Sequence, residues 1–157
     1  MQKITTFLTF KDQAEDALKF YTSVFKNATI GDVRRYGNTG PGPAGSFMTG
    51  TFEIEGQQFM VLNAGADFGF APGISLFVDC KTQEEVDDLW EKLSAGGTVQ
   101  QCGWLQDKFG VSWQIVPSVL MTLMGDPDPV KAERVMKAMM QMVKLDIQKL
   151  QQAYDAA

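Results

Sequence analysis

An amide stands in the middle of the stretch DKFGVSWQIVP (107–117), where a carboxylate would make a metal ligand or a general base. The Asp-x-x-Gly at its start predicts a tight turn, and the β-branched and aromatic residues that follow predict a strand. Gln114 on that strand has three interpretations. It belongs to a site that has lost its metal, it binds a ligand by hydrogen bonds, or it is an ordinary strand residue.

The residue types that are missing narrow the chemistry further. The chain has no histidine and two cysteines, Cys80 and Cys102. Ser-His-Asp and Cys-His catalysis and a histidine general base are therefore excluded, and two cysteines are too few for a Cys-rich zinc site. A hard cation would have to rest on carboxylates and amides. Cys102 is a candidate nucleophile that would need a neighbouring base or cation, and the alternative is a small residue beside a glycine bend.

Other side chains also have two interpretations each. Trp104 and Trp113 would stack on an aromatic or quinone-like ligand, or they pack in the core. Arg34 and Arg35 would hold an anionic substrate, or they protect an exposed strand edge. Any carboxylate near a predicted strand end would serve as a general base, but spacing selects no pair among Glu53, Glu55, Asp67, Asp79 and Asp107.

Charge and length limit the partners. The chain has 157 residues, a net charge of -5 and a pI of about 4.7, which disfavours nucleic acid and anionic membrane surfaces as partners. It contains no apolar run of transmembrane length, and its first residues lack the pattern of a secretory signal. With only two cysteines, the expected location is a reducing cytoplasm.

The same order of elements is predicted twice. Helix 12–25 has Asp12 as its predicted N-cap with Glu15 as the capping-box partner, and helix 81–97 has Thr82 with Glu85. At an offset of 69, residues 14–30 align with residues 83–99 without a gap, and their apolar positions coincide. This match indicates a duplication. The other expected elements are strands at 3–10, 28–37, 47–54, 57–65, 74–80 and within 98–117, and a Gly/Pro loop at 38–46.

The tail from residue 117 differs from both halves. It predicts a short helix, a break at GDPDP and one long helix. The long helix is expected to carry an apolar stripe of Val135, Met139, Met142, Val143, Ile147, Leu150 and Tyr154. Such a Met-rich stripe is ordinary core, or a pliable wall for a ligand or a subunit.

A β-α-β-β-β unit repeated twice resembles the vicinal oxygen chelate (glyoxalase/bleomycin resistance) superfamily. The stretches FYTSVFKNATI, QCGWLQDKFGVSWQIVP and DPDPVKAERVMKAMMQMVKLDI are similar to its PhnB-like family, labelled 3-demethylubiquinone-9 3-methyltransferase. The resemblance implies an α+β fold of two paired βαβββ modules, 1–65 and 66–117, with a helical extension, 118–157, in one compact domain. It also implies an apolar cavity enclosed by curved sheets, and a homodimer.

The resemblance also implies where a metal would lie. Gln114 stands at the place of a ligand glutamate, and Ser75 is nearest to the place of a histidine. The internal alignments then pair Ser75 with Thr6 and Gln114 with Met60. These four side chains offer no anionic ligand and no imidazole, so we expect no metal.

These observations predict a metal-independent protein that binds an apolar or aromatic small molecule. Its candidate ligand-binding residues are Thr6, Met60, Ser75, Cys102, Trp104 and Gln114. No cofactor is expected. The alternative is methyl transfer to a quinone-like substrate with S-adenosylmethionine, as the family label implies, although the Gly-rich loop 38–46 is not a strand-to-helix turn. A third hypothesis is that the helical tail docks a partner.

Overall fold

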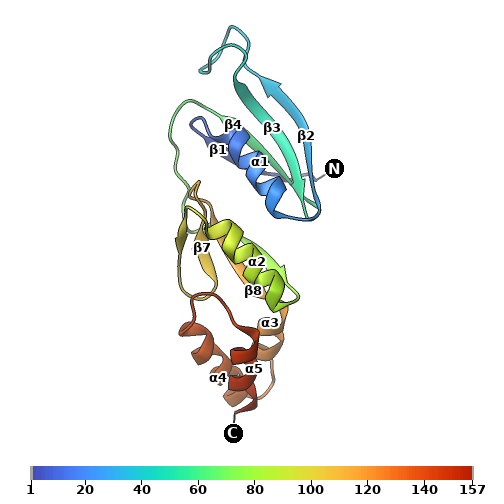
Figure 1. Ribbon diagram of the computed structural model, residues 1–157, viewed down its shortest axis with the longest axis vertical. Helices are drawn as coiled ribbons and strands as arrows, with labels where there is room; N and C mark the ends of the chain where they lie inside the picture. The colour runs from blue at the N-terminus through green and yellow to red at the C-terminus, as the bar shows by residue number, and fades with distance from the viewer. Residues whose placement is uncertain (1, 157) are drawn as a thin grey trace. The chain divides into compact units, whose positions relative to one another are not determined.

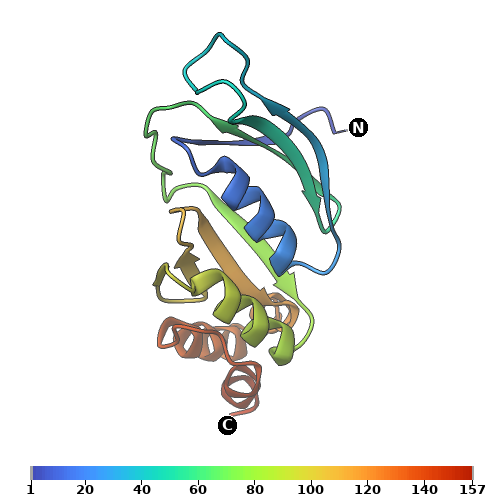
Figure 2. The ribbon, with the colours of Figure 1, turned by 45° about the horizontal axis from the view of Figure 1, so that its top comes forward.

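The computed structural model describes residues 2–156, which divide into two compact units with the boundary after Gly69. Each unit contains one four-stranded sheet with a helix across one face (Figures 1 and 2). The first unit consists of β1 (Thr6–Phe10), α1 (Ala14–Val24), β2 (Ala28–Arg35), β3 (Phe47–Ile54) and β4 (Gln57–Asn63). The second begins with β5 (Ser75–Cys80), α2 (Gln83–Ser94), β6 (Thr98–Val99), β7 (Trp104–Gln106) and β8 (Ser112–Pro117).

The two sheets have the same topology. Their strand orders are β1-β4-β3-β2 and β5-β8-β7-β6. The first strand of each unit pairs in parallel with the last, and the remaining pairs are antiparallel. The predicted α+β fold with two βαβββ modules is therefore confirmed, including the hairpin at Glu55-Gly56, where both residues have positive φ.

Each core lies between the helix and one face of its sheet. In the first unit the rings of Phe52 and Phe59 stack with their centroids 5.0 Å apart, and Tyr21 of α1 stacks on Phe52. In the second unit Trp113 and Ile115 of β8 are fully buried, as are the helix residues Val86 and Leu93 of α2. Apolar residues at period two in the strands and at helical spacing in the helices meet at this interface.

The two helices begin differently. Thr82 caps α2 as predicted, because its Oγ1 accepts from the Glu85 backbone N–H at 3.1 Å. The predicted cap at Asp12 is wrong: the N-cap of α1 is Gln13, whose side chain makes no capping bond. The Asn63 side chain of β4 accepts from the Ala14 N–H at 2.8 Å, 49 residues along the chain. A partner from the neighbouring strand thus satisfies an N–H that a local cap would otherwise bind.

The duplication is real, but it does not have one constant offset. The helices align at an offset of 69, with Ala14 at the place of Gln83. The preceding strands align at 70, with Phe10 at the place of Cys80, because the connection from β1 to α1 is one residue longer. Since neighbouring strand residues point to opposite faces, one residue reverses the face predicted for every side chain of β1.

The helical extension is part of the second unit. It consists of α3 (Ser118–Met124), α4 (Pro129–Met140) and α5 (Ile147–Asp155). Both views place these helices beyond the end of β8 (Figures 1 and 2). Their core joins the end of β8 in a buried cluster of Val116, Leu120, Leu123, Val135, Leu145 and Leu150.

The single long helix predicted for the tail is wrong. The chain leaves helical conformation after Met140, and α5 begins at Ile147. Asp146 caps α5 by accepting from the Lys149 N–H at 3.0 Å. Of the predicted stripe, Val143 is 44% exposed, while Val135 and Leu150 are fully buried. Within residues 2–156, no helix has the length and apolarity needed to cross a membrane.

Candidate ligand-binding face

Three side chains form a cross-strand row on the second sheet. Gln114 of β8 pairs with Phe77 of β5 on one side and with Trp104 of β7 on the other. Paired residues point to the same face, so an amide lies between two aromatic rings. We call Phe77, Gln114 and Trp104 the Gln114 row. The alternate residues Leu105 and Trp113 are buried on the opposite face.

Ser75 supports the row from β5. The Gln114 Nε2 atom donates to Ser75 Oγ at 2.9 Å. Within residues 2–156, the Gln114 Oε1 atom accepts no hydrogen bond that the structure describes. Phe77 is 52% exposed, and Trp104 is partly buried. The row therefore presents two aromatic surfaces and an amide that retains one acceptor and one donor hydrogen.

The equivalent row of the first sheet contains Met60. Met60 pairs with Phe7 of β1 and with Thr51 of β3, so Met60 and Gln114 occupy matching positions, as predicted. The placement of Thr6 is a correction. Thr6 pairs with Phe59, a core residue, and therefore lies on the helix-covered face, opposite to Met60. At the strand offset of 70, the residue that matches Ser75 is Thr5.

Asp107 has a structural position rather than that of a general base. It is 3% exposed. Its Oδ1 accepts from the Phe109 and Val111 N–H groups at 2.9 and 3.1 Å, and its Oδ2 accepts from Trp113 Nε1 at 2.9 Å. These three bonds hold the turn that leads into β8 and orient the Trp113 indole in the core. Trp113 therefore packs inside the unit, and Trp104 is the tryptophan on the Gln114 row.

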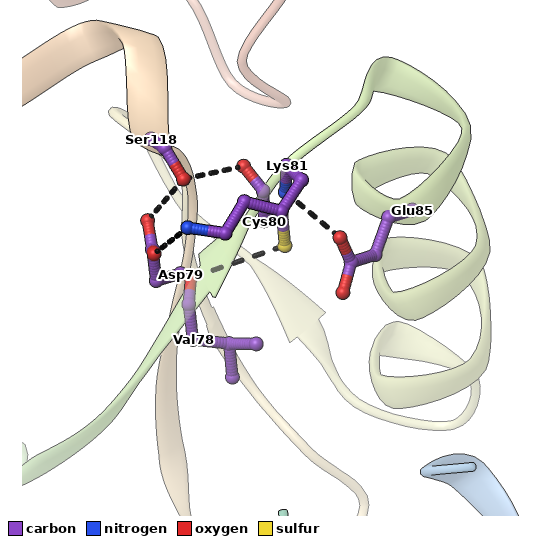
Figure 3. Close-up of polar contacts among 6 residues, drawn as sticks. All are labelled: Val78, Asp79, Cys80, Lys81, Glu85 and Ser118. Carbon is purple, nitrogen blue, oxygen red and sulfur yellow. Dashed lines mark hydrogen bonds and ion pairs between the residues drawn. The ribbon is translucent and has the colours of Figure 1, made fainter.

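The end of β5 is tied to the first residue of the extension. The Ser118 hydroxyl oxygen lies 2.6 Å from Asp79 Oδ1 and 3.2 Å from the Cys80 carbonyl oxygen, and its single hydrogen is shared between these two acceptors. Figure 3 shows both contacts. Lys81 forms an ion pair with the same Asp79 carboxylate at 3.2 Å. The hydrogen bond from Ser118, and then the one from Lys81, hold the pKa of Asp79 below its usual value. The anionic carboxylate thus bonds the extension to the sheet.

The two thiols lie in different surroundings. Cys80 is fully buried, and burial raises the pKa of its thiol to about 12, with the Glu85 and Asp79 carboxylates adding to the effect. Cys102 is partly exposed and lies outside the strands, in the turn before β7. It has a positive φ of 61°. No side chain of the Gln114 row is bonded to it among the hydrogen bonds described for residues 2–156.

This difference predicts selective alkylation. At pH 8, a thiol with a pKa of about 12 holds roughly a thousandth of the thiolate of an ordinary cysteine. Iodoacetamide on the native protein is expected to modify Cys102 and to spare Cys80, as peptide mass spectrometry would measure. Protein unfolded in urea is the control and should be labelled at both positions. Equal native rates at the two cysteines would contradict the prediction.

Of the remaining charged candidates, Glu55, Asp67 and Arg35 have local partners, and Glu53 and Arg34 are exposed on β3 and β2. The Glu55 carboxylate accepts from Asn27, and Asp67 accepts from the Gly69 N–H. Arg35 forms an ion pair with Glu15 of α1 at 3.1 Å, while Arg34 lies exposed on the edge strand β2.

The Gly/Pro loop folds over Tyr36. The Tyr36 hydroxyl donates to the Asn63 carbonyl, and the loop is closed by hydrogen bonds from Tyr36 N to Ser46 O and from Gly45 N to Tyr36 O. A Cβ on Gly42 would lie 2.3 Å from the Tyr36 ring, so this glycine allows the close approach. A pocket of about 480 Å³ lies between this loop and the first turn of α1. Its charged lining includes the bonded pair Arg35 and Glu15.

The side chains that the resemblance suggested as metal ligands, taken within each unit, are poor donors for a divalent cation. Within the second unit Gln114 donates one hydrogen bond to Ser75, and within the first Met60 offers a thioether while Thr6 lies on the opposite face of the sheet from Met60. Neutral hydroxyl, amide and thioether donors replace the water shell of a hard cation poorly. In the part of the chain from 2 to 156, no three acidic or cysteine side chains are grouped to hold a metal ion.

Phe77 is the residue of the Gln114 row that the candidate set from the sequence did not include. The stretch SLFVDC was predicted only as a strand, with no sign of which side chain faces away from the helix. Its exposed ring becomes informative only beside Gln114, and that requires the register of β5 against β8. Alternation along the strand from the candidate Ser75 would have placed Phe77 on the same face.

Comparisons with known proteins agree with this fold. Residues 2–116 match the model of a family described as 3-demethylubiquinone-9 3-methyltransferase. A PhnB protein from Bacillus cereus with the same description is 41% identical, has a TM-score of 0.69, and aligns over 99% of its own chain and 74% of this one. A protein from Pseudomonas aeruginosa is 22% identical with a TM-score of 0.62, over 98% of its chain and 74% of this one.

More distant structures share the fold alone. A fosfomycin resistance protein, FosX, from Listeria monocytogenes is 16% identical with a TM-score of 0.51, over 90% of its chain and 72% of this one. A search of curated proteins finds no match. On the family match and the 41% identity to the Bacillus cereus protein, this chain belongs to the PhnB-like 3-demethylubiquinone-9 3-methyltransferase family.

Proposed function

We propose that this protein binds a flat, uncharged small molecule on the Gln114 row without a metal ion. The observation that carries the proposal is the pairing of Gln114 with Phe77 and Trp104 across three strands. Strands in a sheet are ~4.8 Å apart, so the two aromatic residues start ~10 Å apart. A planar ring between them would meet each side chain at about 5 Å, within the range of aromatic contacts.

The amide adds a directional contact. One Nε2 hydrogen of Gln114 is directed to Ser75. The Oε1 atom and the second Nε2 hydrogen are then available for a ligand that carries an acceptor next to a donor. No member of the row is charged, which favours a neutral ligand. A lactam fused to an aromatic ring has the matching edge and the flat surface.

The alternative is methyl transfer to a quinone-like substrate, the chemistry named in the family's description. A quinone-like ring would also suit the two aromatic side chains. This alternative requires turnover with S-adenosylmethionine, which simple binding does not. Formation of S-adenosylhomocysteine with a quinone-like acceptor would favour it. The homodimer and the cytoplasmic location expected from the sequence stay predictions.

Replacing Gln114 with alanine tests the proposal. We would titrate the protein with quinolin-2(1H)-one and follow amide shifts by NMR. Loss of one net hydrogen bond, about 0.5–1.5 kcal/mol, is expected to weaken binding roughly two- to tenfold. The N-methylated quinolinone lacks the donor but keeps the carbonyl acceptor, so it should bind the unmodified protein more weakly and lose less affinity than quinolin-2(1H)-one on the substitution.

The matched control is Gln57→Ala, which changes an exposed glutamine at the start of β4. It should leave the affinity unchanged. Saturable binding that is equally strong in the Gln114→Ala variant would remove Gln114 from the site. No binding of either quinolinone, of quinones or of other flat aromatic probes would overturn the proposed function.

A further inference from the structure

The helical extension lies outside the part of the chain that defines the family. The family match ends at residue 116, and α3 begins at Ser118. The Bacillus cereus relative aligns over nearly its whole length with 74% of this chain. The extension is therefore an addition to the shared fold, and its contacts with the second sheet show what it does there.

The extension binds the backbone of the turn immediately before Trp104. The Cys102 N–H donates to the Met142 carbonyl at 2.9 Å, and the Gly103 N–H donates to the Val143 carbonyl at 2.8 Å. Both Cys102 and Gly103 have positive φ, at 61° and 82°. The left-handed conformation of these two successive residues directs both N–H groups toward the extension, whose backbone carbonyls accept from them.

Gly103 is held from a second side as well. Its carbonyl accepts from the Ile115 N–H at 2.8 Å, next to Gln114 on β8. A Cβ added to Gly103 would lie 2.9 Å from both the Ile115 carbonyl oxygen and the Leu145 side chain. The extension, the turn and β8 thus meet at one glycine, with no room for another atom.

The segment of the extension that makes these bonds is anchored to α2. The Gln83 side chain donates to the Leu145 carbonyl at 3.0 Å and accepts from the Ile147 N–H at 2.7 Å. Lys144 forms an ion pair with Asp87 at 2.7 Å, which lowers the pKa of that carboxyl. Side chains of α2 therefore fix the segment that in turn fixes residues 102 and 103.

We propose that the extension positions Trp104, and through it sets the affinity of the Gln114 row for its ligand. This inference rests on the proposed function of that row. Trp104 directly follows two residues bonded to the extension, and its own carbonyl accepts from the Gln100 N–H at 2.9 Å. Gln83 and Gly103 are positioning residues, because they act on the ligand through the Trp104 side chain.

The first measurement is amide hydrogen exchange in the full-length protein. Gln83→Ala removes the anchor from α2, and Gly103→Ala forces the turn and Leu145 apart. Both substitutions are expected to speed exchange at residues 102 and 103 by at least about tenfold, because the hydrogen bonds to the extension open more often. The control Lys137→Ala breaks an exposed ion pair with Glu133 on α4 and should change nothing at this turn.

The second measurement is a double-mutant cycle on ligand affinity. Gln83→Ala should weaken quinolin-2(1H)-one binding about threefold or more in the unmodified protein and have no further effect in a Trp104→Leu background. A purely structural role of Gln83 would weaken binding equally in both backgrounds, and that outcome would overturn the inference. The inference would also be overturned if Gln83→Ala sped amide exchange at residues 102 and 103 without changing the affinity. It would be overturned as well if neither Gln83→Ala nor Gly103→Ala changed the exchange rate there.

The two proposals fail in different ways. If the unmodified protein binds none of the flat aromatic probes, both the proposed function and this inference are wrong. If the probes bind and Gln114→Ala weakens them while the double-mutant cycle shows no coupling between Gln83 and Trp104, only the inference is overturned.

Discussion

Asp107→Ala is expected to lower the free energy of unfolding by about 3 kcal/mol. The substitution leaves two backbone N–H groups and the Trp113 indole N–H without the carboxylate that now accepts from all three. Asp107 is 3% exposed, so water does not reach these donors freely. Each buried donor without a partner costs about 1–3 kcal/mol, partly relieved as the turn relaxes.

Urea unfolding followed by circular dichroism would measure the effect. Asp107→Asn should lower the free energy of unfolding by less than Asp107→Ala does. One side-chain oxygen can still accept from the backbone N–H groups, but the new NH₂ group would face the Trp113 indole N–H, which is also a donor. The control is Asp67→Ala, which removes a similar side-chain bond to the Gly69 N–H from an exposed loop and should cost under about 0.5 kcal/mol. Equal losses at both aspartates would show that the buried bonds at Asp107 add nothing.

Leu145→Ala is expected to cost about 3 kcal/mol, in the range for large-to-small changes in a core. Leu145 is fully buried in the cluster that joins the extension to β8, and its side chain packs against Gly103. The substitution would leave a cavity lined by Val116 and the helices of the extension. These neighbours are held by their other contacts, so they cannot close the cavity fully. The loss is expected in the second unit, and hydrogen exchange would locate it there.

Val143→Ala is the matched control for Leu145. Val143 lies two residues away in the same segment but is 44% exposed, so its replacement should cost under about 0.5 kcal/mol. Its carbonyl bond to Gly103 is a backbone contact and survives the change. A comparable loss at both positions would mean that the segment, rather than the buried side chain, carries the stability.

Much of the fold could be predicted from local patterns. The alternation in the strands, the helical spacing of apolar residues and the Glu55-Gly56 turn each depend on residues a few positions apart. The cap at Thr82 is local in the same sense, and it was predicted correctly. The cap of α1 was not, because the Asn63 side chain that provides it lies 49 residues away.

The candidate site was also predicted only in part. Gln114 and Trp104 were identified from residue type and position in predicted strands and Ser75 from the family resemblance, and the structure places all three on one face of the second sheet. Thr6 was assigned to the wrong face because one extra residue between β1 and α1 changes the offset. Whether any of these residues binds a ligand stays a prediction.

The sequence by itself determined the element types, the duplication, the absence of histidine chemistry and the family. The absence of histidine chemistry follows from composition, the element types and the duplication follow from patterns of residues close along the chain, and the family follows from a resemblance in sequence. Only the tertiary structure decided that Phe77 flanks Gln114, that Asp107 serves the core, and that the tail breaks after Met140 to bond the turn before Trp104. Those features depend on strand register and on backbone groups distant in sequence, whose pairing no local periodicity records.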